Sequence, residues 1–191
     1  YFLEANDLYN NDIEEKIGMG CAEHPNGILK LLEATTAYIP SSIDQADHHD
    51  ISFYDHAKLT AAILVAIYEK LMAEDRSDFK NECQLQLSDL LDEKLFLLVS
   101  GDLSGIQDFI YTVAGRGALK SLRGRSFYLE IMVETFIDDL LKEIGLNRAS
   151  LLYNGGGHFY LLLPNTQKVR VTLEESRLKI NNQLLEKFDL N

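Results

Sequence analysis

Apolar positions recur with helical spacing in the first half of the chain. Residues 28–38 form one such stretch, which should end before Pro40 because proline cannot continue a helix. A second stretch, over residues 57–72, is apolar nearly all round, so we expect a helix that is buried on both sides. Asp55 lies just before it and suits an N-cap, with a ligand or interface role as the alternative. A weaker helical segment follows to about Leu91.

The second half opens with a different pattern. The short apolar run from Leu95 to Val99 ends at a glycine, which predicts a buried strand. Ser104 and Gln107 then have the spacing of a capping box and predict a helix that begins near Ile106. A longer apolar stripe follows from about Leu119 to Gly145, so we expect a long helix that packs across a sheet.

A glycine-rich hairpin comes next. Two apolar strands, over residues 150–154 and 158–163, are joined by Gly155-Gly156-Gly157, and glycine supplies the positive φ that a tight hairpin needs. Pro164 should end the second strand, and helical spacing resumes over residues 169–188. The order of elements is therefore β-α-β-β-α, one strand short of the split βαββαβ ferredoxin-like fold.

These patterns predict an α+β chain in two parts. Residues 1–92 should form a mainly helical part, and residues 93–191 an incomplete ferredoxin-like domain whose last strand would follow Asn191. Because the chain starts at Tyr1 and stops without a final strand, we expect it to be an internal piece of a longer protein.

Composition narrows the class of partner. The 191 residues include 18 Lys and Arg against 30 Asp and Glu, a formal charge of -12, so the chain as a whole repels nucleic acid and anionic lipid. Any phosphate contact needs a local basic patch. The longest apolar run, residues 61–68, is far shorter than the roughly 20 residues of a spanning helix, so we expect neither a membrane protein nor a secreted precursor.

Cysteine and histidine spacing gives weak signals for metal. Cys21 and Cys83 lack C-x-x-C spacing, which argues against a zinc ribbon and favours two free thiols. The doublet His48-His49 lies in a polar loop, where solvated side chains are expected. Asp55 and His56 follow within ten residues, and together these side chains include several possible metal ligands. Asp55 and His56 are therefore the candidate metal ligands.

A candidate nucleotide site lies at one edge of the predicted sheet. Asp102 follows the first strand and should neighbour the turn Gly155–Gly157. Nucleotidyltransferase palms carry acidic residues at both places, where they hold two Mg²⁺ ions. Here the hairpin continues with His158 and has no carboxylate, so we expect this domain to bind rather than catalyse. In the alternative interpretation the glycines serve only the hairpin, and Ser104 only the helix cap.

A second candidate is a cluster of cations at the glycine-rich start of the long helix. A helix N-terminus and these side chains would attract the same anion, so the cluster predicts a phosphate or RNA-backbone site. A solvated basic face that pairs with an acidic partner domain is the alternative. The four cations are Arg116, Lys120, Arg123 and Arg125.

Four segments carry a resemblance to a known family. They begin Ser-Gly-Asp-Leu-Ser-Gly-Ile-Gln, Leu-Arg-Gly-Arg-Ser-Phe-Tyr, Asn-Arg-Ala-Ser-Leu-Leu-Tyr and Asp-Ile-Ser-Phe-Tyr-Asp-His, and they cover residues 100–111, 122–129, 147–160 and 50–62. The first three resemble the first palm domain of the large subunit of type III-A CRISPR effector complexes. The fourth resembles the end of that subunit's N-terminal HD domain.

The resemblance implies an antiviral, RNA-guided enzyme of the prokaryotic cytoplasm. The intact subunit would combine an HD-type single-strand DNase, which needs a divalent metal, with two palms. Between them ATP, with Mg²⁺ or Mn²⁺, would become cyclic oligoadenylates when target RNA binds. The expected partners are the other effector subunits, guide RNA, target RNA and single-stranded DNA. The zinc cysteines and the Gly-Gly-Asp-Asp hairpin of this family are absent here.

The resemblance assigns this chain the non-catalytic half of the ATP pocket, with no catalytic residue of its own. The nucleotide-binding residues would be Asp102, Ser104, Gly105, Gly155, Gly156, Gly157 and His158. Arg123 and Arg125 are weaker candidates. The alternative function is a non-enzymatic scaffold palm that docks partner subunits and guide RNA. A free-standing diguanylate-cyclase-like enzyme is disfavoured because the hairpin lacks carboxylates.

Overall fold

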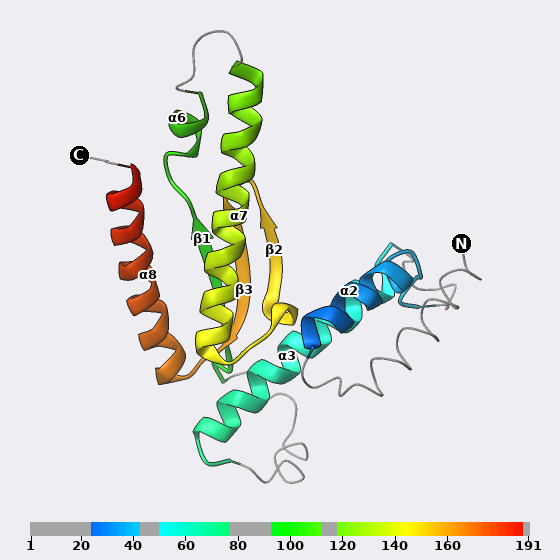
Figure 1. The fold of residues 1–191 in the computed structure, drawn as a ribbon. Helices are drawn as coiled ribbons and strands as arrows, with labels where there is room; N and C mark the ends of the chain where they lie inside the picture. The colour runs from blue at the N-terminus through cyan, green and yellow to red at the C-terminus, as the bar shows by residue number, and fades with distance from the viewer. Residues whose placement is uncertain (1–23, 43–49, 77–92, 112–117, 189–191) are drawn as a thin grey trace. The chain divides into compact units, whose positions relative to one another are not determined.

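The computed structural model describes residues 24–42, 50–76, 93–111 and 118–188 (Figure 1). The chain divides into two compact units. Unit 1 comprises Tyr1–Val65 with Asn147–Ser150, and unit 2 comprises Ala66–Leu146 with Leu151–Asn191. The boundary expected near residue 93 follows a segment, 77–92, that lies outside the described residues, and it stays a prediction.

Unit 1 contains helix α2, Pro25–Thr36, and the first part of helix α3, Phe53–Ala73. Proline occupies the first turn of α2, where its missing N–H leaves no hydrogen bond unmade. The 3₁₀ turn η2, Arg148–Ser150, belongs to the same unit, and the backbone N–H of Arg148 donates to the Asn26 side chain over 3.0 Å. Both predicted helices are therefore confirmed.

Helix α3 differs from its prediction in two ways. Its N-cap is Ser52, whose hydroxyl accepts a hydrogen bond from the Asp55 N–H at 3.0 Å and donates to the Asp55 carboxylate at 2.8 Å. The N-cap role expected of Asp55 was wrong, because the helix begins earlier and places Asp55 in its first turn. The expected burial on both sides was also wrong, since Leu64 is 61% exposed and Tyr68 is 48% exposed.

Unit 2 contains a three-stranded antiparallel sheet with helices packed on it. The strands are β1 (Phe96–Asp102), β2 (Leu151–Gly155) and β3 (His158–Pro164), in the spatial order β1-β3-β2. The helices are α6 (Ile106–Tyr111), α7 (Ala118–Ile144) and α8 (Gln167–Phe188). This β-α-β-β-α order confirms the predicted α+β, ferredoxin-like arrangement without a fourth strand in the described residues (Figure 1).

The core lies between the sheet and helix α7. Val133, Ile137 and Leu141 of α7 pack with Leu161 and Leu163 of β3, and Val169 of α8 joins them. Helix α7 ends where predicted. Gly145 has a φ of +93°, and the N–H of Leu146 bonds to the carbonyl of Leu141 at 2.8 Å, which is the Schellman pattern.

The hairpin is as tight as the sequence predicted. Gly155 closes β2 opposite His158, so only two residues, Gly156 and Gly157, make the turn. Their φ values are +62° and +86°, the positive pair that a type I′ turn requires. Glycine is needed at both positions because a side chain strains this backbone conformation.

Strand β1 is less buried than the sequence predicted. It continues to Asp102, and its residues alternate between exposed and partly buried. Leu97 and Val99 pack on the core, whereas Phe96 and Leu98 point away from it and are 46% and 66% exposed. The sheet therefore has one face covered by helices and one open face. An apolar run alone does not reveal this.

The cap at the start of helix α6 differs from its prediction. Helix α6 begins at Ile106, so Gly105 occupies the position before it and the predicted capping box at Ser104 was wrong. No helix among the described residues is long and apolar enough to cross a membrane.

Candidate functional site

The turn after β1 and the glycine hairpin are joined directly. The backbone N–H of Leu103 donates to the carbonyl of Gly157 over 3.0 Å. The Cδ1 atom of Ile106 lies so close to Gly157 that a β-carbon there would be only 2.0 Å away. The sequence-based expectation that these two loops are neighbours is confirmed, and they form one end of the open sheet.

Asp102 and His158 form a side-chain pair at this end. They are direct cross-strand partners on β1 and β3, so both point to the open face. Nδ1 of His158 lies 3.1 Å from Oδ1 of Asp102, with the two side chains 59% and 56% exposed. The imidazole and the carboxylate are therefore within ion-pair distance, and both side chains are accessible on the open face.

Two glycines leave the backbone accessible at this end of the sheet. Gly156 in the hairpin and Gly105 in the turn after β1 have positive φ values of +62° and +79°. Neither has any atom within 4 Å of the point that a β-carbon would occupy. A ligand can therefore approach the main chain more closely here than at any residue with a side chain.

Two tyrosines extend the open face away from the hairpin. Tyr153 of β2 and Tyr160 of β3 are opposite each other in the register, and their ring centroids are 6.2 Å apart. Both are more than 40% exposed. The sequence analysis did not single them out, although the alternation of side chains in strands could have placed them on the same face as His158.

The donor atoms at this site do not fit a metal ion. Asp102 is its only carboxylate from the two loops, and His158 already engages it. In the part of the chain that the structure describes, no group of three His, Cys, Asp or Glu side chains could hold a metal. We therefore derive no metal-dependent step at this end of the sheet.

The candidate metal ligands Asp55 and His56 belong to unit 1, whereas the sheet belongs to unit 2. The Asp55 carboxylate accepts the Ser52 hydroxyl, and this cap explains the residue without a metal. His56 is exposed on α3. His48 and His49 fall outside the described residues. Metal binding by Asp55 and His56 stays a prediction.

The side chains beside Asp55 are partly buried. Burial lowers the pKa of Lys58, against the opposing effect of the Glu33 and Asp55 carboxylates. The Lys58 ammonium lies 5.8 Å from the centre of the Tyr54 ring. Burial also raises the pKa of Tyr54, and the same two carboxylates raise it further. Lys58 and Tyr54 thus contact each other along α3, near the carboxylates of Glu33 and Asp55.

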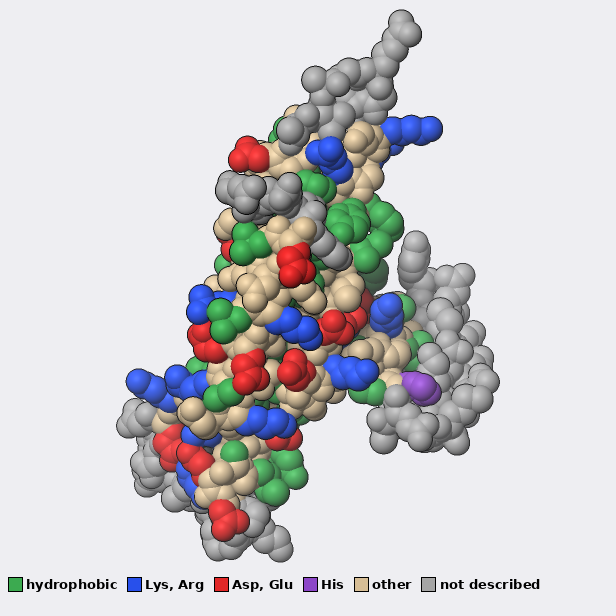
Figure 2. All heavy atoms as spheres, turned by 60° about the vertical axis from the view of Figure 1, so that its left-hand side comes forward, with side chains coloured by type: hydrophobic (Ala, Val, Ile, Leu, Met, Phe, Trp, Pro, Cys, Tyr) green, Lys and Arg blue, Asp and Glu red, His purple; other side chains and the backbone are tan. Residues whose placement is uncertain are grey.

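The predicted cationic cluster divides in the structure. Arg116 lies outside the described residues, and Lys120 and Arg123 are exposed on α7. Arg125 is partly buried and turns inward, where its guanidinium bonds to the carbonyl of Phe109. Figure 2 shows basic and acidic side chains interspersed over the face that it presents, not gathered in one basic patch.

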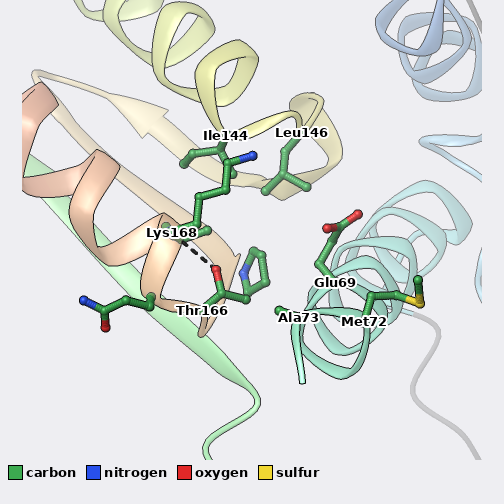
Figure 3. A pocket seen from close by; sticks show the side chains of 10 residues that line it. Glu69, Met72, Ala73, Ile144, Leu146, Thr166 and Lys168 are labelled. Atoms are coloured by element: carbon green, nitrogen blue, oxygen red, sulfur yellow. Dashed lines mark hydrogen bonds between the residues drawn. The ribbon is translucent and has the colours of Figure 1, made fainter. Parts of the chain in front are cut away.

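A separate cavity of about 480 Å³ lies near the opposite end of β3. Figure 3 shows Lys168 and Thr166 at the start of α8. Ile144 at the end of α7, Leu146 just after it and Glu69 of α3 also line the cavity. The Thr166 hydroxyl caps α8 by accepting the N–H of Val169 at 3.2 Å. None of the residues predicted from the sequence to bind nucleotide lines this cavity.

Comparison with known proteins places the sheet in a family. Residues 95–191 match the family described as Csm1 subunit domain B. The CRISPR system single-strand-specific deoxyribonuclease Cas10/Csm1 (subtype III-A) of Mycobacterium tuberculosis is 49% identical over 161 residues, which are 84% of this chain and 20% of that protein. Its counterpart in Enterococcus italicus is 46% identical over 166 residues, which are 85% of this chain and 22% of that protein.

Solved structures agree with the sequence relatives. The crystal structure of Csm1 in T. onnurineus is 36% identical, with a TM-score of 0.68 over 85% of this chain and 21% of that one. The Csm1-Csm4 cassette in complex with AMPPNP is 38% identical, with a TM-score of 0.68 over 84% of this chain and 20% of that one. The chain spans about a fifth of the length of these relatives, and by sequence and fold together it belongs to the Csm1 family of subtype III-A CRISPR systems.

Proposed function

We propose that this chain is part of the large subunit of a type III-A CRISPR effector and supplies one half of its ATP pocket. The intact subunit would degrade single-stranded DNA and would make cyclic oligoadenylates from ATP when target RNA binds. The half-pocket consists of the turn Asp102–Gly105 and the hairpin Gly155–His158. Its role is to bind and orient ATP, because it lacks the carboxylates that a catalytic palm needs.

One observation carries this proposal. Gly105 and Gly156 come from two loops that a backbone hydrogen bond joins, and both have empty space where a β-carbon would lie. Open space beside a glycine does not by itself indicate a ligand, because Gly145, which ends α7, has it too. The support for a pocket is that two such glycines lie beside the Asp102–His158 pair at one end of the open face, where a ligand can approach the backbone.

The neighbouring side chains suit the parts of a nucleotide. The imidazole of His158 lies beside Asp102 on the open face, where it can contact a phosphate oxygen or a base. The exposed rings of Tyr153 and Tyr160 offer flat apolar surfaces for the purine. The catalytic carboxylates and the other half of the pocket would come from a second palm of the same subunit.

The relatives support this assignment. The curated relatives are described as single-strand-specific deoxyribonucleases of subtype III-A. Csm1-Csm4 cassettes that resemble this chain have been solved in complex with one ATP, with AMPPNP and with cA4. The second palm and the nuclease domain would lie in the remaining length of such a subunit, and the partner subunits would be separate chains.

A matched pair of variants at Gly156 tests the proposal in the full-length subunit within its complex. Asn and Asp have the same size, and both tolerate positive φ better than most residues. Gly156→Asp adds a negative charge beside the expected phosphates, whereas Gly156→Asn does not. We expect Gly156→Asp to weaken AMPPNP binding at least about tenfold relative to Gly156→Asn. Equilibrium binding and the rate of cyclic oligoadenylate synthesis are the measurements.

The opposite result has a clear meaning. If both variants assemble normally and bind AMPPNP with equal affinity, the hairpin does not contact the nucleotide phosphates. The palm would then be the scaffold that docks partner subunits and guide RNA. A deficit in complex assembly for both variants, with unchanged nucleotide affinity, would likewise favour the scaffold over the ATP pocket.

A further inference from the structure

Helix α6 lies next to the candidate ATP pocket, but it is short and has no buried residue to fix its position. It is only six residues long, Ile106–Tyr111, and none of them is buried. An isolated helix of this length is unstable in water, so contacts with the rest of the domain must fix it. Ile106 against the hairpin provides one such contact, at the start of the helix.

Arg125 provides a second contact, at the end of the helix. From α7, its guanidinium Nη1 donates a hydrogen bond to the backbone carbonyl of Phe109, and its Cζ atom lies 5.0 Å from the centre of the Phe109 ring. Carbonyls in the last turn of a helix have no partner within the helix. A cation there satisfies the carbonyl, is attracted by the negative end of the helix dipole, and stacks on the aromatic face.

This contact connects to the pocket through a single helical turn. The N–H of Phe109 donates to the carbonyl of Gly105 over 3.1 Å, and Gly105 is one of the two open glycines. The next residue, Ile106, fills the space beside Gly157. If α6 moved away from α7, Gly105 and Ile106 would move with it, and the turn would lose its fixed position against the hairpin.

We propose that Arg125 is a positioning residue for the nucleotide, acting through Phe109 to hold the Gly105 turn and the hairpin in their binding arrangement. This inference rests on the proposed ATP pocket. It gives Arg125 a role different from that of a solvent-exposed cation on the same helix. Lys142 of α7 is exposed and is not among the candidate binding residues, so it serves as the control.

The test uses the full-length subunit in its assembled complex, with AMPPNP as the probe. Arg125→Met removes both contacts with Phe109, and Lys142→Met removes a charge from the same helix. We expect Arg125→Met to weaken AMPPNP binding about tenfold and Lys142→Met to change it less than about twofold. Arg125→Lys keeps the charge without the planar stacking group, and it should restore part of the affinity. Amide hydrogen exchange in residues 106–111 should rise in Arg125→Met before any nucleotide is added.

Hydrogen exchange separates positioning from direct contact with phosphate. If Arg125 acts through Phe109, the loss of AMPPNP binding in Arg125→Met is accompanied by faster exchange in residues 106–111 before nucleotide is added. A loss of binding with unchanged exchange in these residues would mean that Arg125 contacts the nucleotide itself, and would overturn the inference. So would Arg125→Met binding AMPPNP as tightly as Lys142→Met. The Gly156 variants then show whether the pocket itself stands. If Gly156→Asp binds AMPPNP more weakly than Gly156→Asn, only the role of Arg125 is rejected. If the two bind it equally, the proposed pocket is rejected as well.

Discussion

The two faces of the small sheet have opposite properties although the same three strands build both. On the helix-covered face, Leu161 and Leu163 of β3 have no exposed surface, and they pack with α7. On the open face, Leu98 is 66% exposed, and the polar pair Asp102–His158 lies at the glycine-rich end. Cross-strand partners share a face, but the open face is not exposed along its whole length. Leu162 and Pro164 of β3 lie opposite Leu98 and Phe96, and both are buried.

The difference separates what holds the domain together from what is available to a ligand. Burial of apolar side chains on the covered face supplies the stability of the palm. The exposed residues of the open face, such as Leu98 and those at the glycine-rich end, contribute little to that stability, so they are free to serve binding. A substitution on one face should therefore change stability, and a substitution on the other should change nucleotide affinity.

The largest expected effect comes from the covered face. Leu161→Ala removes a fully buried side chain and leaves a cavity, so it should cost about 2–5 kcal/mol of stability. Leu98→Ala on the open face is the control and should cost less than about 0.5 kcal/mol. Native-state hydrogen exchange of the β3 amides in the full-length subunit measures both changes. Equal losses for the two variants would contradict the division between the faces.

A smaller effect distinguishes the two turn glycines. Gly156→Ala and Gly157→Ala should each cost about 1 kcal/mol, because both φ values are positive. Only at Gly157 would the new β-carbon also collide with Ile106, at 2.0 Å, so we expect Gly157→Ala to cost about 1–3 kcal/mol more. The same exchange measurement on the hairpin amides tests this order.

Ile106→Ala provides the matching control for that collision. Combined with Gly157→Ala it should recover most of the extra loss, whereas combined with Gly156→Ala it should recover nothing. Without such selective recovery, the contact between Ile106 and the hairpin would not set the position of the two loops, and the link between α6 and the pocket would fail.

Local sequence signals predicted the elements of the palm well. Three consecutive glycines between apolar runs specify a tight hairpin, and Gly145 after the apolar stripe ends α7, because both conformations need positive φ. That Asp102 lies beside the hairpin could be predicted from the β-α-β-β order alone. These features depend on short-range backbone preferences and on chain connectivity, which one sequence contains.

Burial that depends on long-range packing was harder to predict from the sequence. The apolar run of β1 predicted a buried strand, but nothing in the described residues covers Leu98. The apolar face of α3 led to the same error. An apolar side chain indicates that a position can be buried. Whether it is buried depends on which other parts of the fold pack over it.

The exact pairs within the site were also out of reach. Pairing of Asp102 with His158 depends on the β1–β3 register, and a shift of one residue would have put His158 on the covered face. Arg125 looked like a phosphate ligand because its sequence neighbours are basic and glycine-rich. Its contact with Phe109 joins residues sixteen positions apart, which no local pattern indicates.

The central claim is that ATP binds at the glycine-rich end of the open face. Hydrogen–deuterium exchange of the full-length subunit with and without AMPPNP tests it most directly, because each segment of the palm is measured in one experiment. The account predicts that AMPPNP slows exchange in residues 102–106 and 155–158 and leaves residues 161–164, on the far half of β3, unchanged. Protection confined to residues 144–146 and 164–169, around the cavity of Figure 3, or no protection anywhere in the palm, would contradict it.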